Sequence, residues 1–167
     1  RLDGEIRTVL DACTAVQDPE SGETLFHGIL VDITDRQRAA QDQRQTLSVL
    51  TAALESTADG LLVVDAAGKI TTFNRKFVEM WHLPEEIIAS RDDERAIQFV
   101  LDQLKDPDGF LRKVRELYAT PDAASFDELE FKDGRIFERY SQPQRIDGKS
   151  VGRVWSFHDV TTRKTAE

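Results

Sequence analysis

Two spacings of apolar residues alternate along the chain, and the change from one to the other marks the predicted elements. Residues 9–33 and 136–160 each contain runs rich in β-branched and aromatic residues around a Gly-containing turn, which is typical of a β-hairpin. Both hairpins end in Asp-(Ile/Val)-Thr and pass directly into a polar segment of helix formers. We expect Thr34 and Thr161 to cap these helices. A pattern repeated at this distance indicates tandem domains rather than a solenoid.

Residues 35–57 read as one helix between the first hairpin and the rest of the chain. Leu47, Leu50 and Leu54 follow a 3-4 spacing, and Ala40 lies one heptad before Leu47. This spacing predicts a short, weak coiled-coil seam. A solvated connector helix that rests one face on its own domain fits the same residues, and both interpretations stay open.

The second part of the chain predicts one antiparallel sheet with helices on one face, an α+β domain. Two short strands, at 61–65 and 70–73, come first, and Asn74 is expected to cap the helix that follows. Four helical pieces follow: 75–81, 84–88 with Pro84 in its first turn, 96–104, and a helix that Asp106-Pro107 opens. They lead to three strands at 126–131, 136–146 and 151–160. Pro143 cannot donate to a ladder, so a bulge or loosened pairing is expected near it.

Composition and charge narrow the classes of function. The chain has 167 residues, of which 40% are apolar and 32% charged, with a net charge of −9. Such a charge argues against binding to nucleic acid or to anionic lipid, and the longest aliphatic run, residues 61–64, is far too short to span a membrane. Cys13 is the single cysteine, which suits a reducing cytoplasm. We therefore expect a cytoplasmic protein that contacts neither nucleic acid nor membrane.

Five short motifs, in order, resemble the PAS family of sensory domains. Residues 62–70 resemble its opening hairpin, 73–77 its Asn-started helix, and 84–87 its Pro-Glu-Glu turn. Residues 133–135 and 159–164 resemble its closing Asp-Gly turn and its Asp-Ile-Thr exit motif. The resemblance implies a five-stranded antiparallel sheet of order 2-1-5-4-3, with a pocket between the sheet and the helices.

The resemblance also implies a domain plan. Residues 1–38 would be the C-terminal hairpin of a preceding PAS domain, 39–57 a signalling linker helix, and 58–162 a complete PAS domain. Residues 163–167 would begin the helix to an output domain. The implied parent protein belongs to bacterial signalling, typically a histidine kinase or a diguanylate cyclase.

The sequence lacks the residues that bind the known cofactors of the family. Flavin-binding light sensors carry a reactive cysteine soon after the Pro-Glu-Glu turn, but residues 89–94 contain none. Haem-binding members offer a histidine from the long helix, and residues 107–119 contain none. His82, beside a helix end, is more typical of a surface histidine. We expect no flavin, no haem, no metal and no catalysis, since no pair of groups is placed for acid–base work.

An unidentified small organic ligand remains the expected occupant of the pocket. Strand parity and helix spacing, together with the resemblance, predict a lining of Phe77, Met80, Trp81, Leu101, Val114, Tyr118, Phe131, Arg139, Trp155 and Phe157. Plain core packing explains the same aromatic residues. Because a buried arginine needs an anion partner, Arg139 suggests a carboxylate-bearing ligand.

The sequence therefore supports two candidate functions. The first is a sensor module that binds a small molecule and relays its state through the terminal helices. The second is a ligand-free structural domain that serves as a dimerisation spacer. In both, we expect a homodimer through the linker helix and the N-terminal hairpin, because the hairpin leaves an apolar face without its own domain.

Overall fold

The computed structural model describes residues 4–167 and divides the chain into two units, one ending at Ala52 and the other running from Ala53 to Glu167. Each unit is described by itself. In the described residues, no helix combines the length and the apolar character needed to cross a membrane.

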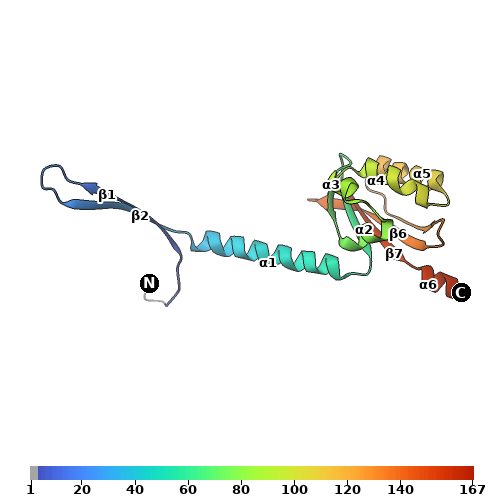
Figure 1. The fold of residues 1–167 in the computed structure, drawn as a ribbon, viewed down its shortest axis with the longest axis horizontal. Coiled ribbons are helices and arrows are strands. Elements are labelled where there is room, and N and C mark those ends of the chain that lie inside the picture. Colours follow the sequence, from blue (N-terminus) through green and yellow to red (C-terminus); the bar gives the residue numbers. More distant parts are fainter. Residues whose placement is uncertain (1–3) are drawn as a thin grey trace. The chain divides into compact units, whose positions relative to one another are not determined.

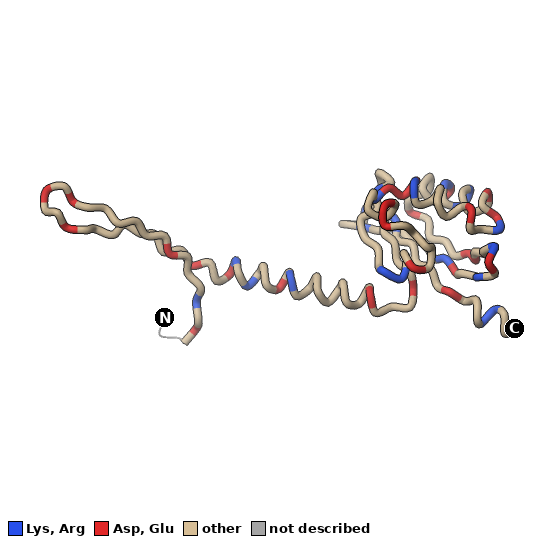
Figure 2. Tube along the Cα trace, viewed as in Figure 1, with Lys and Arg blue, Asp and Glu red and all other residues tan. Residues whose placement is uncertain are grey.

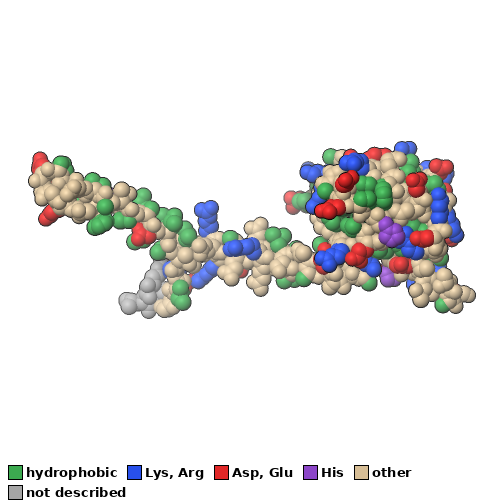
Figure 3. All heavy atoms as spheres, in the orientation of Figure 1, with side chains coloured by type: hydrophobic (Ala, Val, Ile, Leu, Met, Phe, Trp, Pro, Cys, Tyr) green, Lys and Arg blue, Asp and Glu red, His purple; other side chains and the backbone are tan. Residues whose placement is uncertain are grey.

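The first unit is a two-stranded hairpin followed by a long helix (Figure 1). β1 (Val9–Gln17) pairs antiparallel with β2 (Thr24–Asp32), and α1 (Thr34–Ser56) follows. Acidic residues gather at the hairpin turn (Figure 2), whereas apolar side chains line the strands (Figure 3). These exposed apolar residues are Val9, Leu10, Val16, Leu25, Phe26, Ile29, Leu30 and Val31. Neither face of the hairpin is therefore packed within this unit.

The start of α1 differs from the prediction that Thr34 caps it. The Thr34 hydroxyl donates to Asp32 Oδ1 at 2.6 Å and accepts the N–H of Thr8 at 2.7 Å. The main-chain N–H of Thr34 also donates to Asp32 Oδ1, at 3.0 Å. The hydroxyl is thus used to hold the helix start against the first strand, because partners across the hairpin compete with the local cap.

The second unit is a five-stranded antiparallel sheet with helices on one face, as predicted (Figure 1). The strand order is β4-β3-β7-β6-β5, which is the expected 2-1-5-4-3 arrangement. The elements are β3 (Gly60–Asp65), β4 (Ile70–Phe73), α2 (Arg75–Trp81), α3 (Glu85–Ala89), α4 (Asp93–Val100), the 3-10 turn η1 (Leu101–Gln103), α5 (Pro107–Ala119), β5 (Ser125–Glu130), β6 (Ile136–Ile146), β7 (Lys149–Asp159) and α6 (Thr161–Ala166).

The core lies between the inner face of the sheet and the helices. Alternate residues of β3 and β7 are buried, and the register sets Leu62 opposite Trp155 on this face. α4 and α5 bury one stripe each, as their helical spacing predicts. Gly60 lets α2 approach closely, since a Cβ there would lie 2.9 Å from Phe77 Cα.

Three local details depart from the sequence prediction. Pro84 is the N-cap of α3 rather than a residue of its first turn. The helix expected over 96–104 ends at Val100 and continues as η1. The irregularity expected near Pro143 lies just beyond it, between Gln144 and Arg145, where the β6–β7 register shifts.

Candidate functional site

A small internal cavity of about 40 Å³ lies between the inner face of the sheet and α2, α4 and α5. Its wall is almost entirely apolar. The lining residues are Leu62, Phe77, Trp81, Leu83, Asp93, Ala96, Ile97, Val100, Phe110, Val114, Tyr118, Arg139, Trp155 and Phe157. A buried water needs roughly 10–15 Å³ by this measure, so the space corresponds to about three water-sized atoms. This volume is well below the ~300–1,000 Å³ of a typical ligand site.

The structure brings together seven of the ten predicted pocket residues, all except Met80, Leu101 and Phe131. Met80 is buried where α2 approaches Gly60, with its Sδ 2.9 Å from an ideal Cβ at that glycine. Leu101 is half-buried in η1. Phe131 is tilted against Phe137, with 4.4 Å between ring centroids. These three residues belong to the surrounding core. The sequence did not separate them from the lining, because spacing identifies a buried face but not which of its residues border a cavity.

Sequence reasoning missed half of the lining. Leu62 and Phe110 were recognised as apolar, but only their tertiary position puts them at the cavity. The same is true of four further buried residues. Leu83 lies in the loop after α2, and Ala96, Ile97 and Val100 lie on α4. From the sequence alone, the acidic run 92–94 that contains Asp93 is typical of a solvated helix start. No local signal distinguishes Asp93 from Asp92, whereas strand–helix packing buries it.

Aromatic rings enclose most of the cavity. Trp81 contacts Phe157 edge-on at 5.2 Å between centroids and tilts against Phe110 at 6.0 Å. Tyr118 and Trp155 form a further edge-on pair, also at 6.0 Å. Such geometries are the favoured ones for aromatic pairs and stabilise a rigid wall.

Arg139 is buried on β6, as predicted for an inward residue, but its anion partner belongs to the protein. Its Nε lies 2.8 Å from Asp127 Oδ1 and its Nη2 lies 2.5 Å from Asp127 Oδ2. The guanidinium also lies over the Phe110 and Trp155 rings, at 4.8 and 5.4 Å. This pair removes the reason to expect a carboxylate-bearing ligand at Arg139.

Two buried N–H donors on side chains of the cavity lining have no hydrogen-bond partner among residues 4–167. They are Arg139 Nη1 and Trp81 Nε1, on side chains that are 1% and 2% exposed. Buried polar groups are normally hydrogen-bonded, and leaving a donor unsatisfied costs about 1–3 kcal/mol. Each of these two donors would be stabilised by an acceptor within its reach.

Asp93 places a carboxylate in the same wall. The residue is only 5% exposed, and the Tyr118 hydroxyl donates to its Oδ2 at 2.5 Å. Burial raises the pKa of Asp93 to about 6, with the charges of Glu94 and Asp92 adding to the rise and the Tyr118 hydrogen bond opposing it. The pKa of Tyr118 is raised by burial and by the Asp93 charge. Within residues 4–167, none of the ion pairs involves Asp93.

Asp93 and Tyr118 also separate the cavity from a surface groove. Both residues line the cavity, and both line an open groove of about 510 Å³ on the other side. The groove carries the carboxylates of Asp65, Asp92 and Glu94 in addition to Asp93. Its one guanidinium, Arg153, donates to main-chain carbonyls at the end of α5 and to Ser141. The groove is therefore acidic on balance.

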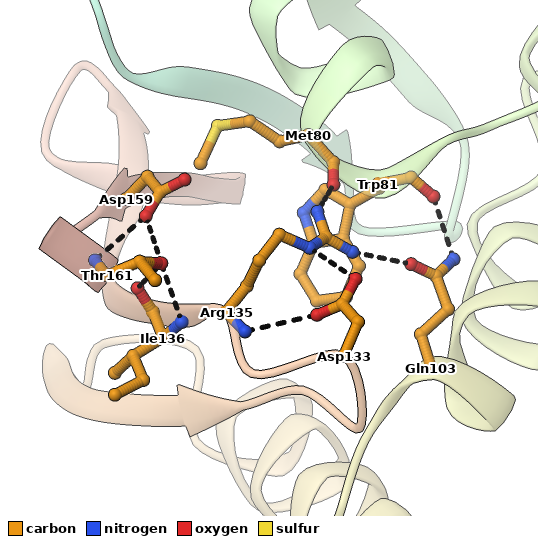
Figure 4. Close-up of polar contacts among 8 residues, drawn as sticks. All are labelled: Met80, Trp81, Gln103, Asp133, Arg135, Ile136, Asp159 and Thr161. Carbon is orange, nitrogen blue, oxygen red and sulfur yellow. Dashed lines mark hydrogen bonds and ion pairs between the residues drawn. The ribbon is translucent and has the colours of Figure 1, made fainter. Parts of the chain in front are cut away.

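A second polar cluster holds the C-terminal end of α2 (Figure 4). Arg135, in the turn before β6, donates through Nη1 to the Met80 carbonyl and through Nη2 to Gln103 Oε1 at 3.3 Å. Gln103 Nε2 in turn donates to the Trp81 carbonyl at 2.8 Å. Arg135 is oriented by Asp133, 2.8 Å from its Nε. The helix that carries Trp81 is thus tied to the turn that opens β6.

The next residue, Ile136, contacts the exit motif (Figure 4). The Thr161 hydroxyl accepts the Ile136 N–H at 3.0 Å and donates to Asp159 Oδ1 at 2.5 Å. The N–H of Thr161 donates to the same carboxylate oxygen, at 2.9 Å. Thr161 therefore makes no side-chain cap, contrary to the prediction, and repeats the contacts of Thr34 with Asp32 and Thr8.

α6 is also tied to the sheet by charge. Arg163 Nη2 pairs with Glu138 on β6, and Lys164 Nζ lies 3.2 Å from Glu128 on β5. Exposed pairs of this kind each contribute at most about 1 kcal/mol. They orient the short exit helix more than they stabilise it.

Two types of side chain that bind cofactors are missing from the cavity lining. The lining contains neither cysteine nor histidine, so no thiol can form a flavin adduct and no imidazole can bind haem iron. The described residues also contain no group of three or more His, Cys, Asp or Glu side chains that could hold a metal ion.

Comparison with known proteins gives one family and several structural neighbours. A family model described as "PAS fold" matches residues 54–167. The chain is similar to the PAS domain of an HTR-like protein from Haloarcula marismortui (20% identity, 74% of this chain and 98% of that chain, TM-score 0.53). It is also similar to the PAS domain of Bordetella pertussis BvgS (18%, 73% and 91%, TM-score 0.54). At these identities the likeness shows the fold alone.

A third neighbour is the sensor region of a sensor histidine kinase, with 19% identity and a TM-score of 0.49. The match covers 63% of this chain and spans 40% of that one. No curated protein matches the chain.

Proposed function

Because the chain belongs to the PAS fold family, we propose that it is a cytoplasmic sensor module of a bacterial signalling protein. The module binds a small molecule in the cavity and passes its state through α6 to an output domain, of the histidine kinase or diguanylate cyclase type. Residues 1–38, of which the structure describes 4–38, are the end of a preceding PAS domain, and residues 39–57, which include most of α1, are the linker. The segment itself is not an enzyme.

The observation that carries this proposal is the double role of Trp81. Its ring lines the cavity, and its main-chain carbonyl accepts from Gln103, which contacts Arg135. Arg135 is the neighbour of Ile136, whose N–H is held by Thr161 at the start of α6. A ligand that displaces the indole ring would therefore act on the exit helix through three consecutive hydrogen-bonded contacts.

A ligand-free dimerisation spacer is the second candidate, and two observations favour it. The cavity is only about 40 Å³. The exposed apolar residues of the hairpin, together with Leu47 and Leu50 on α1, offer surface for a second copy of the chain. In this alternative the domain sets the distance and orientation between its neighbours, and the core simply packs.

The test is whether an occupant of the cavity exists and controls output. Native mass spectrometry of the purified protein should detect a co-purifying small molecule, and its signal should fall in the double variant Val100→Ile, Val114→Ile. Both substitutions add one methylene to the cavity wall. In the complete parent protein, the same variant should give an output that no longer responds to the stimulus.

The matched control is Val154→Ile, which adds the same methylene to β7 on the opposite parity, outside the cavity lining. It should retain both the bound molecule and the response. An output that is regulated normally in the double variant, with no co-purifying molecule in either protein, would establish the spacer instead.

A further inference from the structure

The polar groups of the cavity wall specify one class of ligand. They are a carboxylate on one wall, from Asp93, and two N–H donors without partners, Trp81 Nε1 and Arg139 Nη1. Everything else in the lining is apolar, apart from the Tyr118 hydroxyl, which already donates to Asp93. The ligand that satisfies this wall needs both a hydrogen-bonding cation and an acceptor.

The charges of the lining residues determine whether the ligand should be a cation or an anion. Arg139 is neutralised by its two-point contact with Asp127. Asp93 is buried, and its side-chain partner is the neutral Tyr118 hydroxyl rather than a cation. A buried charge without a counter-ion is costly, whereas a buried charge with one is far less so. The lining as a whole therefore carries one uncompensated negative charge.

The rest of the wall suits an organic cation. Five aromatic rings line the cavity: those of Phe77, Trp81, Phe110, Trp155 and Phe157. Aromatic walls attract ammonium groups, and the attraction increases when the ammonium is removed from water. A site with a carboxylate on one side and aromatic rings around it is suited to bind an amine.

We propose that the cavity binds a small organic ammonium compound that also carries an oxygen acceptor, such as an amino amide or amino alcohol. The ammonium group pairs with Asp93, and the oxygen accepts from Trp81 Nε1 and Arg139 Nη1. The cavity has room for about three water-sized atoms, which limits the compound to a few non-hydrogen atoms. This inference rests on the proposed sensing function and names the ligand class of the same site.

The route to the cavity follows from the same residues. The Tyr118–Asp93 hydrogen bond stands between the cavity and the groove of about 510 Å³, which has four carboxylates against one guanidinium. An acidic groove concentrates cations at its surface. Tyr118, 37% exposed at the end of α5, can swing outward, so its hydroxyl acts as the gate that an amine replaces at Asp93.

The test uses glycinamide, which has both groups, and three compounds that each lack one feature. Ethylamine lacks the oxygen, acetamide lacks the ammonium, and acetate is an anion. The chain has two tryptophans, so its indole N–H signals in a nitrogen–proton correlation spectrum are two, and Trp81→Phe assigns them. Glycinamide should shift the Trp81 signal with a saturating curve. Ethylamine and acetamide should each bind at least tenfold more weakly, and acetate should not bind.

Variants of the two gate residues give the second readout. Asp93→Asn should weaken glycinamide binding at least tenfold and remove its advantage over acetamide, whereas Asp93→Glu should retain part of it. Tyr118→Phe removes the competing hydroxyl, so glycinamide should bind at least as tightly as in the unmodified protein. Glycinamide binding that is equal in Asp93→Asn overturns the proposal.

The outcomes also separate this inference from the sensing function. Tighter binding of acetamide or acetate than of glycinamide would refute the ammonium class while leaving a ligand-binding sensor in place. If none of the four compounds moves an indole signal, the class inference fails as well. If, in addition, native mass spectrometry finds no co-purifying molecule, the sensing function fails with it.

Discussion

The side-chain amide of Asn74 donates to the main-chain carbonyl of Leu54 at 2.8 Å, which joins the last turn of α1 to the start of α2. The same amide donates to the Asp59 carbonyl at 2.9 Å, and its Oδ1 accepts the N–H groups of Leu61 and Phe77. One side chain, 1% exposed, thus fixes the ends of three elements: α1, β3 and α2. α2 carries Trp81, so this amide positions the cavity wall relative to the last turn of α1, residues 53–56.

Asn74→Ala should therefore lower the free energy of unfolding by about 2–4 kcal/mol, because it leaves several buried main-chain groups unpaired. Urea unfolding of the purified chain measures this difference. Gln98→Ala is the matched control, since Gln98 is an exposed amide whose side chain contacts only Glu94. It should change stability by less than about 0.5 kcal/mol. Equal losses in the two variants would contradict the role given to Asn74.

Asp93 should make the protein less stable as the pH rises from about 4 to 6. Its pKa in the folded protein is about 6, against an ordinary value of 3.8, so the folded state holds the proton longer than the unfolded chain. The contribution of Asp93 to stability is therefore greatest below pH 4 and falls through this window, by up to about 2–3 kcal/mol at pH 7. Asp93→Asn, which cannot ionise, should be more stable than the unmodified protein at pH 7 and similar to it at pH 4.

Urea unfolding at a series of pH values measures both proteins. The groups that face Asp93 are Tyr118 on α5 and, on its own element, Asp92 and Glu94. Asp102→Asn, an exposed carboxylate in η1, is the control and should leave the pH dependence unchanged. A stability difference between Asp93→Asn and the unmodified protein that is independent of pH would show that the Asp93 carboxyl is not the titrating group.

Arg135 should couple the cavity to the exit helix. Arg135→Ala removes its contacts with the Met80 carbonyl, Gln103 and the Phe131 ring, at a cost of about 1.5–3 kcal/mol. The Ile136 amide, held by Thr161, should then exchange its hydrogen at least tenfold faster. Hydrogen exchange followed by mass spectrometry or NMR reports this change.

Two substitutions separate coupling from general loss of stability. Arg135→Lys keeps the positive charge but replaces the planar guanidinium with an ammonium group, so its effect should be intermediate. Arg145→Ala breaks an exposed pair with Asp122 and should cost less than about 1 kcal/mol, with exchange at Ile136 unchanged. Exchange at Ile136 that is unaffected in Arg135→Ala would remove Arg135 from the proposed relay.

The length of α1 should set the rotational phase between its two ends if two chains pair along it. One residue inserted between Arg44 and Gln45 turns everything beyond it by about 100°, whereas seven nearly restore the heptad phase. In the complete parent protein, the single insertion should lock or abolish regulated output, and the heptad insertion should preserve most of it. Output assayed against insertions of one to seven residues should be periodic. A flat response would favour the solvated connector helix.

Purified protein should be colourless. The segment after the Pro-Glu-Glu turn, residues 89–94, has no cysteine, and α5 has no histidine. Absorption spectra of freshly purified protein check this, and a flavin or haem band would contradict it.

Local patterns were sufficient for the fold because the contacts that define it are short in sequence or strictly periodic. The Asn74 cap, the Asp106-Pro107 helix start and the strand alternation that turns Trp155 and Phe157 inward are all set by neighbours within a few residues. For the same reason the order of the five strands followed once the motifs were recognised. The roles of Thr34 and Thr161 were mispredicted because their hydroxyls bind strands 26 and 25 residues away.

Only the tertiary structure decided what the cavity can bind. The sequence predicts that Arg139 points inward, but not that Asp127 neutralises it from the neighbouring strand. It does not distinguish Asp93 from the exposed Asp92 beside it, because that difference comes from packing against Tyr118, 25 residues further on. Periodicity assigns a side chain to a face. Charge compensation and free volume depend on which distant side chains meet on that face, and they exist only once the chain is folded.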